Sequence, residues 1–118
     1  MRVTCMRIFV LMVVSLLAGA TNARSQQEID SAGYALTGCR LLASDTLERM
    51  FEQSRCADKI KMIFRHKNSA QNCPPRRSNI KENAALVVRY IELRPDRWHE
   101  KFLVLAEEAL TEDWPCQR

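Results

Sequence analysis

Glycine, histidine and aromatic residues are scarce in this chain. Its 118 residues include three glycines, two histidines and four prolines, and aromatic residues make up 7% of the composition. Beyond a short apolar run near the N-terminus there is no long hydrophobic segment, and no segment alternates apolar and polar residues for the length of a strand. The scarcity of glycine disfavours a turn-rich β fold. These absences favour an all-α protein.

Motifs for catalysis, metal binding and phosphate binding are also missing. The sequence has no G-x-S-x-G motif and no glycine-rich phosphate loop, and His66 and His99 are its only histidines. Its later cysteines are 17, 17 and 43 positions apart, whereas zinc sites bring ligands closer together in sequence. Glu107 and Glu108 are adjacent, so they point to different sides of a helix. We therefore predict no enzyme, no bound metal and no cofactor.

The first twenty residues have the pattern of a secretory signal peptide. Arg2 and Arg7 form a basic start, an apolar stretch runs from Ile8 to Leu17, and the small residues Ala18-Gly19-Ala20 follow. Cleavage is expected after Ala20, which stands where a lipoprotein would carry its acylated cysteine. We therefore expect a soluble mature protein in an oxidising compartment, most simply a bacterial periplasm. The alternative is an uncleaved N-terminal anchor.

Cleavage removes Cys5 and leaves an even number of cysteines. In a short exported chain this predicts two disulfides. The four mature cysteines are Cys39, Cys56, Cys73 and Cys116.

The mature chain, residues 21–118, reads as one compact domain of four helices. Apolar residues recur at three- and four-residue spacings in four segments, and a loop with two prolines, Lys67–Pro75, separates the second from the third. The predicted helices are Gln26–Leu42, Asp45 to about His66, Ser78 to about Pro95, and Asp96 to about Thr111. Under this arrangement Cys39 meets Cys56 and Cys73 meets Cys116, while the other two connectivities stay open.

Caps and apolar faces refine this prediction. Asp45 with Glu48, and Ser78, are the expected N-caps of the second and third helices. We expect Trp98 in the core and Trp114 packed against the helices to hold the C-terminal tail. The apolar face of the second helix is expected to contain Leu47, Met50, Phe51, Ala57, Ile60, Ile63 and Phe64.

Charge is unevenly distributed along the chain. The formal net charge of +4 loses two positive charges with Arg2 and Arg7, which gives no argument for nucleic-acid binding. The segment from Lys59 to Lys81 contains seven basic residues and no acid, and Glu107 to Asp113 contains four acids and no base. Each is either ordinary solvated surface or a patch that steers an oppositely charged partner.

An ordered set of residues runs through most of the mature chain: Cys39, Cys56, Cys73-x-Pro75, Val87-Val88-x-Tyr90-Ile91, Arg94-Pro95 to His99, Ala109-Leu110, and Trp114-Pro115-Cys116. This set resembles the pattern of a known family, the Rap/Tai-type immunity proteins of bacterial type VI secretion. The C-terminal half is the more specific part of the match. After Cys56 the family's Gly-Tyr-Ile-x-Gly is Asp58–Met62 here, and Asn72 replaces an aromatic residue before the third cysteine.

The resemblance implies an exported helical protein that binds a peptidoglycan-cleaving amidase toxin in the periplasm. Inhibition would come from occlusion of the toxin's active-site groove by a loop or helix face. If the basic segment makes the contact, the partner-binding residues are Arg65, Lys67, Arg76 and Arg77. The alternative function is a small periplasmic helper, such as an acid-stress chaperone, without a dedicated toxin partner. A homodimer is also compatible with a helical domain of this size.

Overall fold

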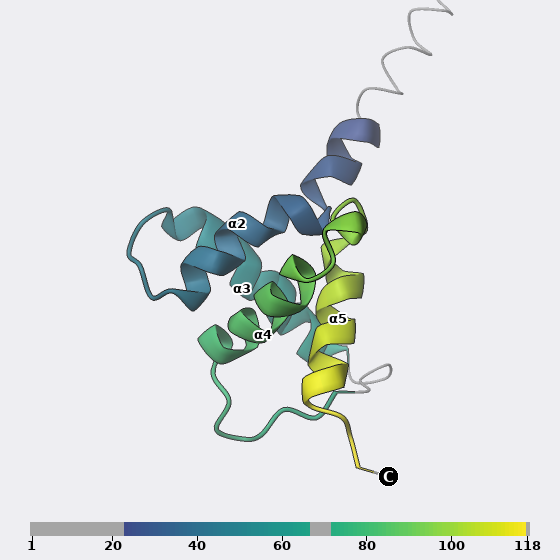
Figure 1. Cartoon of the computed structure of the whole chain (residues 1–118). Coiled ribbons are helices and arrows are strands. Elements are labelled where there is room, and N and C mark those ends of the chain that lie inside the picture. Colours follow the sequence, from purple (N-terminus) through teal and green to yellow (C-terminus); the bar gives the residue numbers. More distant parts are fainter. Residues whose placement is uncertain (1–22, 67–71, 118) are drawn as a thin grey trace, which may run out of the picture.

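The computed structural model describes residues 23–66 and 72–117, so the predicted signal peptide and Lys67 lie outside the described residues. The elements in this part are α2 (Ala32–Ala43), α3 (Met50–Arg65), α4 (Ile80–Glu92), the 3-10 helix η1 (Pro95–Arg97) and α5 (Phe102–Asp113) (Figure 1). Residues 23–29 are also helical. The described ranges contain no strand, only two isolated β-bridges. The all-α prediction is confirmed, but the helix count is not four.

The N-terminal helix was predicted as one segment, Gln26–Leu42, and it is broken at Asp30 and Ser31. Ser31 is extended and accepts a hydrogen bond from the Tyr34 N–H, so it caps α2. The N–H groups of Ala32 and Gly33 donate to the carbonyls of Glu100 and Trp98, at 2.8 and 2.9 Å. The N-terminal end of α2 is therefore hydrogen-bonded to the segment that precedes α5. In Figure 1 the helical residues 23–29 extend beyond the four longer helices.

The start of α3 was also predicted wrongly. Asp45 is not its cap: the backbone of Asp45 and Arg49 is left-handed, with φ of 60° and 51°, and α3 begins only at Met50. The side-chain amide of Gln53 donates to the carbonyls of Thr46 and Glu48, at 2.8 and 2.6 Å. These hydrogen bonds hold residues 44–49 as an ordered loop instead of a first helical turn.

Helix α4 follows the sequence prediction closely, but the start of α5 was predicted wrongly: α5 begins at Phe102, not at Asp96. Asn79, one residue after the expected Ser78, caps α4, and with Glu82 it forms a capping box. Helix α5 begins at Phe102 because Pro95 starts the separate 3-10 turn. Trp98 is only partly buried against the core, and its indole N–H donates to the Ile91 carbonyl at 2.9 Å. The largest fully buried side chains are Phe102, Leu36, Ile60, Ile91, Leu105, Leu110 and Val87.

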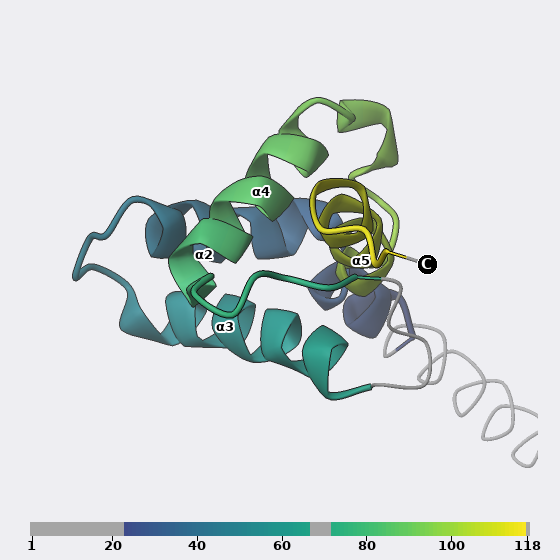
Figure 2. The same cartoon turned by 90° about the horizontal axis from the view of Figure 1, so that it is seen from below.

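The four longer helices surround this core, and α5 runs across the direction of α2 and α3. In Figure 2 α5 is seen almost end on, while α2 and α3 lie across the view. Helix α2 makes its most extensive contacts with α3 and α4, and α4 also packs on α5. Within the described ranges no helix is long and apolar enough to cross a membrane.

Two disulfides join the helices and the tail. Cys39 of α2 is bonded to Cys56 of α3, and Cys73 is bonded to Cys116 after α5. The Cys73 N–H also donates to the Trp114 carbonyl at 2.6 Å, and the Trp114 indole N–H donates to Asn83 at 3.2 Å. The C-terminal tail is therefore held against α4 and the segment that follows α3.

Candidate functional site

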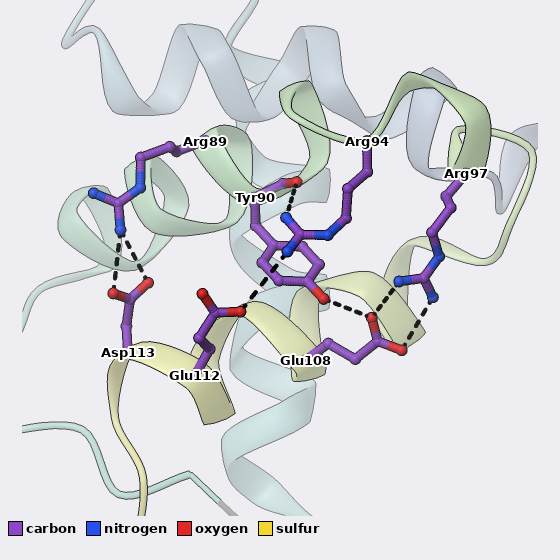
Figure 3. A network of polar contacts seen from close by, with 7 residues as sticks. All are labelled: Arg89, Tyr90, Arg94, Arg97, Glu108, Glu112 and Asp113. Carbon is purple, nitrogen blue, oxygen red and sulfur yellow. Dashed lines mark hydrogen bonds and ion pairs between the residues drawn. The ribbon is translucent and has the colours of Figure 1, made fainter.

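The acidic stretch between Glu107 and Asp113 is largely paired within the protein (Figure 3). Glu108 accepts hydrogen bonds from the Arg97 guanidinium at 2.7 and 3.1 Å and from the Tyr90 hydroxyl at 2.9 Å. Asp113 accepts from Arg89 at 3.1 Å. The hydrogen bonds from Arg97 hold the pKa of Glu108 below its usual value, against the opposing effect of burial. Carboxylates on α5 thus clamp it to α4 and η1.

A third arginine, Arg94, also links α4 to α5. The Arg94 guanidinium lies 3.5 Å from the centre of the Tyr90 ring, donates to the Tyr90 carbonyl at 2.9 Å, and pairs with Glu112 at 3.9 Å. Burial and the hydrogen bond to Glu108 raise the pKa of Tyr90. Three of the four acids in this stretch therefore have arginine partners, and the geometry favours a structural role over partner steering.

The basic residues between Lys59 and Lys81 do not all have the same surroundings. Lys59 and Lys81 have internal partners, Asp30 and Asp45. Arg65 ends α3, whereas residues 76–77 lie in the segment that leads into α4. Arg65, Arg76 and Arg77 are exposed, and none forms an ion pair with another described residue. Their role in partner binding, with that of Lys67, stays a prediction.

The two histidines do not form a recognisable catalytic arrangement. His66 follows the last residue of α3, and His99 is exposed beside Trp98. Among the residues of the described part, no group of three His, Cys, Asp or Glu side chains is placed to hold a metal ion.

A pocket of about 250 Å³ opens between α2 and α3. Helix α2 contributes Tyr34, Thr37 and Gly38, and α3 contributes residues that include Glu52, Arg55 and Lys59; Arg49 lies just before α3. The helices approach closely here because Gly38 of α2 has no side chain that would keep α2 away from the backbone of Glu52 in α3. We call this the α2–α3 pocket.

An arginine between two aromatic rings lies at the α2–α3 pocket. The Arg55 guanidinium carbon is 5.5 Å from the centre of the Tyr34 ring and 5.8 Å from that of Phe51. Phe51 and Arg55 are four residues apart on α3, so they share a face of the helix. Cation–π contacts of this kind combine charge and apolar area at one place.

Apolar side chains extend this surface along the loop that joins α2 and α3. Leu47 is 85% exposed, Phe51 71% and Met50 59%, although the sequence predicted all three in the core. The late start of α3 explains the difference, because it leaves Leu47 outside the helix and Met50 and Phe51 on its first turn. We call Leu47, Met50 and Phe51 the apolar tip. An exposed apolar cluster of this kind is typical of a binding surface.

Sequence reasoning did not identify this surface. Helical periodicity assigned Leu47, Met50 and Phe51 to one buried face, and Tyr34 and Arg55 were given no role. The available signal was the four-residue spacing of Phe51 and Arg55, together with Gly38 beside Cys39.

A family model supplies the identification. The model of the Rap1a immunity proteins matches residues 17–116, which include all four disulfide cysteines and the whole α2–α3 surface. The chain belongs to the Rap1a immunity protein family. No curated protein and no solved structure matches it.

Membership of the Rap1a family gives the chain an immunity-protein-like role. Such a role implies a protein partner, a toxin, and immunity proteins are generally not enzymes. The relevant site is therefore a protein-binding surface, and the α2–α3 pocket with the apolar tip is the best candidate in the described part.

Proposed function

We propose that this Rap1a-family protein neutralises a peptidoglycan-cleaving amidase toxin by covering its active-site groove. The observation that carries the proposal is the projecting apolar tip, Leu47, Met50 and Phe51. In Figures 1 and 2 the loop that joins α2 and α3 projects at one end of the molecule. A convex apolar tip suits a concave groove, and occlusion requires no chemistry from the inhibitor.

The projecting loop is well braced for binding. Gln53 donates two hydrogen bonds to its carbonyls, the Glu48 N–H donates to the Thr46 hydroxyl at 3.2 Å, and Lys81 pairs with Asp45. A loop that is already ordered loses less conformational entropy on association, so more of the contact energy contributes to affinity.

The proposed site of action is the periplasm. Residues 1–20 carry the sequence pattern of an export signal, and the mature protein would comprise residues 21–118. Two disulfides support an oxidising compartment, since such bonds persist in exported proteins. Peptidoglycan, the substrate of the proposed toxin, is in the same compartment.

The first experiment identifies the partner. The oxidised mature chain serves as bait for the secreted and periplasmic fractions of its own organism, and mass spectrometry identifies what is retained. A single stoichiometric cell-wall amidase, inhibited by the purified chain in a peptidoglycan hydrolysis assay, is the expected result. A diverse set of clients, or no amidase at all, would contradict the proposal and favour the chaperone alternative.

A second experiment tests the apolar tip. Leu47→Asp places a charge at the centre of the expected contact and should abolish inhibition of the amidase. Leu93→Asp is the matched control, because Leu93 is 73% exposed but lies between α4 and η1. Both variants should keep the wild-type circular dichroism spectrum. Inhibition that survives Leu47→Asp, or is lost equally with Leu93→Asp, would remove the apolar tip from the interface.

Charge reversal tests the basic stretch in the same assay. If Arg65, Lys67, Arg76 and Arg77 contact the toxin, replacing all four with glutamate should weaken binding at about 50 mM salt, where exposed charges are only weakly screened. Unchanged affinity would exclude these residues from the interface.

A further inference from the structure

Arg55 differs from the other arginines in the described part of the chain. Five of them, Arg40, Arg49, Arg89, Arg94 and Arg97, form ion pairs. Among those without one, Arg24, Arg65, Arg76 and Arg77 are exposed, whereas Arg55 is partly buried. Partial burial removes some of the water around the Arg55 guanidinium, and no ion pair with a carboxylate in this part of the chain offsets the free-energy cost of that loss.

The surroundings of Arg55 orient its guanidinium, and the nearby carboxylate of Glu52 is hydrogen-bonded to Arg49 instead. Its contacts are the rings of Tyr34 and Phe51 and a long hydrogen bond, 3.5 Å, to the Tyr34 hydroxyl. Stacking on aromatic faces leaves the in-plane N–H donors of an arginine free for a planar anion. The two rings therefore hold Arg55 in place while its donors stay available.

The α2–α3 pocket has an excess of positive charge. Arg49, Arg55 and Lys59 line it with one acid, Glu52, which is already bonded to Arg49 at 2.8 and 3.1 Å. Lys59 is paired only at 3.8 Å, with Asp30. Burial lowers the pKa of Lys59, and the nearby charge of Arg55 lowers it further. An incoming anion would reduce this repulsion.

The size of the α2–α3 pocket limits the ligand. At about 250 Å³ it is below the roughly 300–1,000 Å³ that is usual for small-molecule sites. It is large enough for a side chain of a partner, and Arg55 in its lining contacts Phe51 of the apolar tip.

We propose that the α2–α3 pocket receives an aspartate or glutamate side chain of the toxin, whose carboxylate is bound by Arg55 between Tyr34 and Phe51. This inference rests on the proposed function and names the chemistry of its contact. Arginine and carboxylate form two parallel N–H···O bonds, so the pair sets orientation as well as affinity. The apolar tip supplies the surrounding contact that excludes water from the pair.

The test uses the amidase retained by the wild-type chain and measures its dissociation constant by titration calorimetry. Arg55→Ala should weaken binding by at least about tenfold, as is usual for a buried arginine anchor. Arg55→Lys should show a smaller loss, because an ammonium keeps the charge but not the paired donors. Arg24→Ala, which removes an exposed arginine outside both the α2–α3 pocket and the basic stretch, is the control and should bind within about twofold of the wild type.

A double-mutant cycle identifies the partner group. Surface aspartates and glutamates of the amidase are replaced one at a time by asparagine or glutamine, and the carboxylate that contacts Arg55 should show a non-additive loss with Arg55→Ala. Arg55→Ala should keep the wild-type circular dichroism spectrum and lower the thermal unfolding midpoint by only a few degrees, since the contacts that it loses within the chain are two partly exposed cation–π pairs and one long hydrogen bond.

The outcomes separate the two proposals. If the wild-type chain binds no cell-wall amidase, the proposed function fails and this inference fails with it. If the wild type binds but Arg55→Ala binds equally well, only the α2–α3 pocket is excluded. An equal loss in Arg24→Ala would indicate a general charge effect and would also overturn the assignment of Arg55.

Discussion

Gly38 of α2 packs directly on the backbone of Glu52 in α3: a Cβ atom at position 38 would lie 2.4 Å from the Glu52 carbonyl oxygen. No real Cβ contact is this short, and the obstructing atom belongs to the backbone of a helix. The close approach brings Cys39 and Cys56 within bonding distance, with their Cα atoms 5.3 Å apart. One glycine thus contributes both to the disulfide and to the narrow α2–α3 pocket.

Gly38→Ala should destabilise the protein by about 1–3 kcal/mol, because α2 and α3 must move apart to admit the methyl group. Gly33→Ala is the matched control on the same helix, since its Cβ would meet Trp98 only at an ordinary 3.4 Å. Alanine is the better helix former, so Gly33→Ala should be neutral or stabilising by up to about 1 kcal/mol. Urea denaturation of the oxidised proteins gives both values. Equal free energies of unfolding for Gly38→Ala and the wild type would show that α2 and α3 move apart without loss of stability.

Asn79→Ala should cost about 1 kcal/mol, because it removes the side-chain acceptor of the α4 capping box. Ser78→Ala, at the position that the sequence first suggests as the cap, should change the free energy of unfolding by less than about 0.5 kcal/mol. The comparison is made by chemical denaturation. A larger effect at Ser78 than at Asn79 would place the helix boundary one residue earlier.

The stability of the fold should fall in acid as the carboxylates bonded to Arg97 become protonated. Hydrogen bonds from Arg97 lower the pKa of Glu100 and Glu108 in the folded protein. A carboxylate with a lowered folded-state pKa stabilises the fold above its unfolded-state pKa, and this contribution is lost as the pH falls through the folded-state pKa. Thermal unfolding midpoints measured from pH 7 downwards should therefore fall once the pH is below the pKa of an ordinary glutamate.

Glu108→Gln tests the source of this acid dependence. The variant should be less stable at pH 7 and should lose less stability on acidification than the wild type. Glu107→Gln is the control, because Glu107 forms no ion pair with another described residue. An unaltered acid profile in Glu108→Gln would assign the effect to other groups. Opening of the helical structure between pH 4 and 3 in the wild type would support the acid-stress chaperone alternative.

The two disulfides should differ in their rates of reduction. Cys39 is fully buried and Cys56 is 2% exposed, whereas Cys73 is exposed and Cys116 partly so. Attack by a thiolate requires access to sulfur, so a mild reductant should open Cys73–Cys116 first. Alkylation at timed intervals followed by peptide mass spectrometry measures the order. In concentrated guanidinium chloride the difference should disappear, and simultaneous reduction of the folded protein would contradict the prediction.

Helical periodicity predicted the C-terminal half well. Ala84, Val87 and Ile91 of α4, and Phe102 and Leu105 of α5, recur at three- and four-residue spacings, and all of them are buried. These helices pack on neighbours along most of their length, so a stripe of apolar residues corresponds to a buried face. The same reasoning failed for Leu47, Met50 and Phe51, which no helix among the described residues covers.

The amino-acid sequence by itself determined the all-α class, the core of α4 and α5, the two-disulfide composition and the likeness to an immunity family. Each depends on local periodicity or on counts that hold for any arrangement of the helices. The tertiary structure alone decided the break at Asp30 and Ser31, the exposure of the apolar tip and the position of Arg55 between Tyr34 and Phe51. The break accompanies hydrogen bonds from the start of α2 to the segment before α5, and the other two features depend on how α2 and α3 pack. Both are set by contacts between residues that are far apart in the sequence, and no local pattern encodes such contacts.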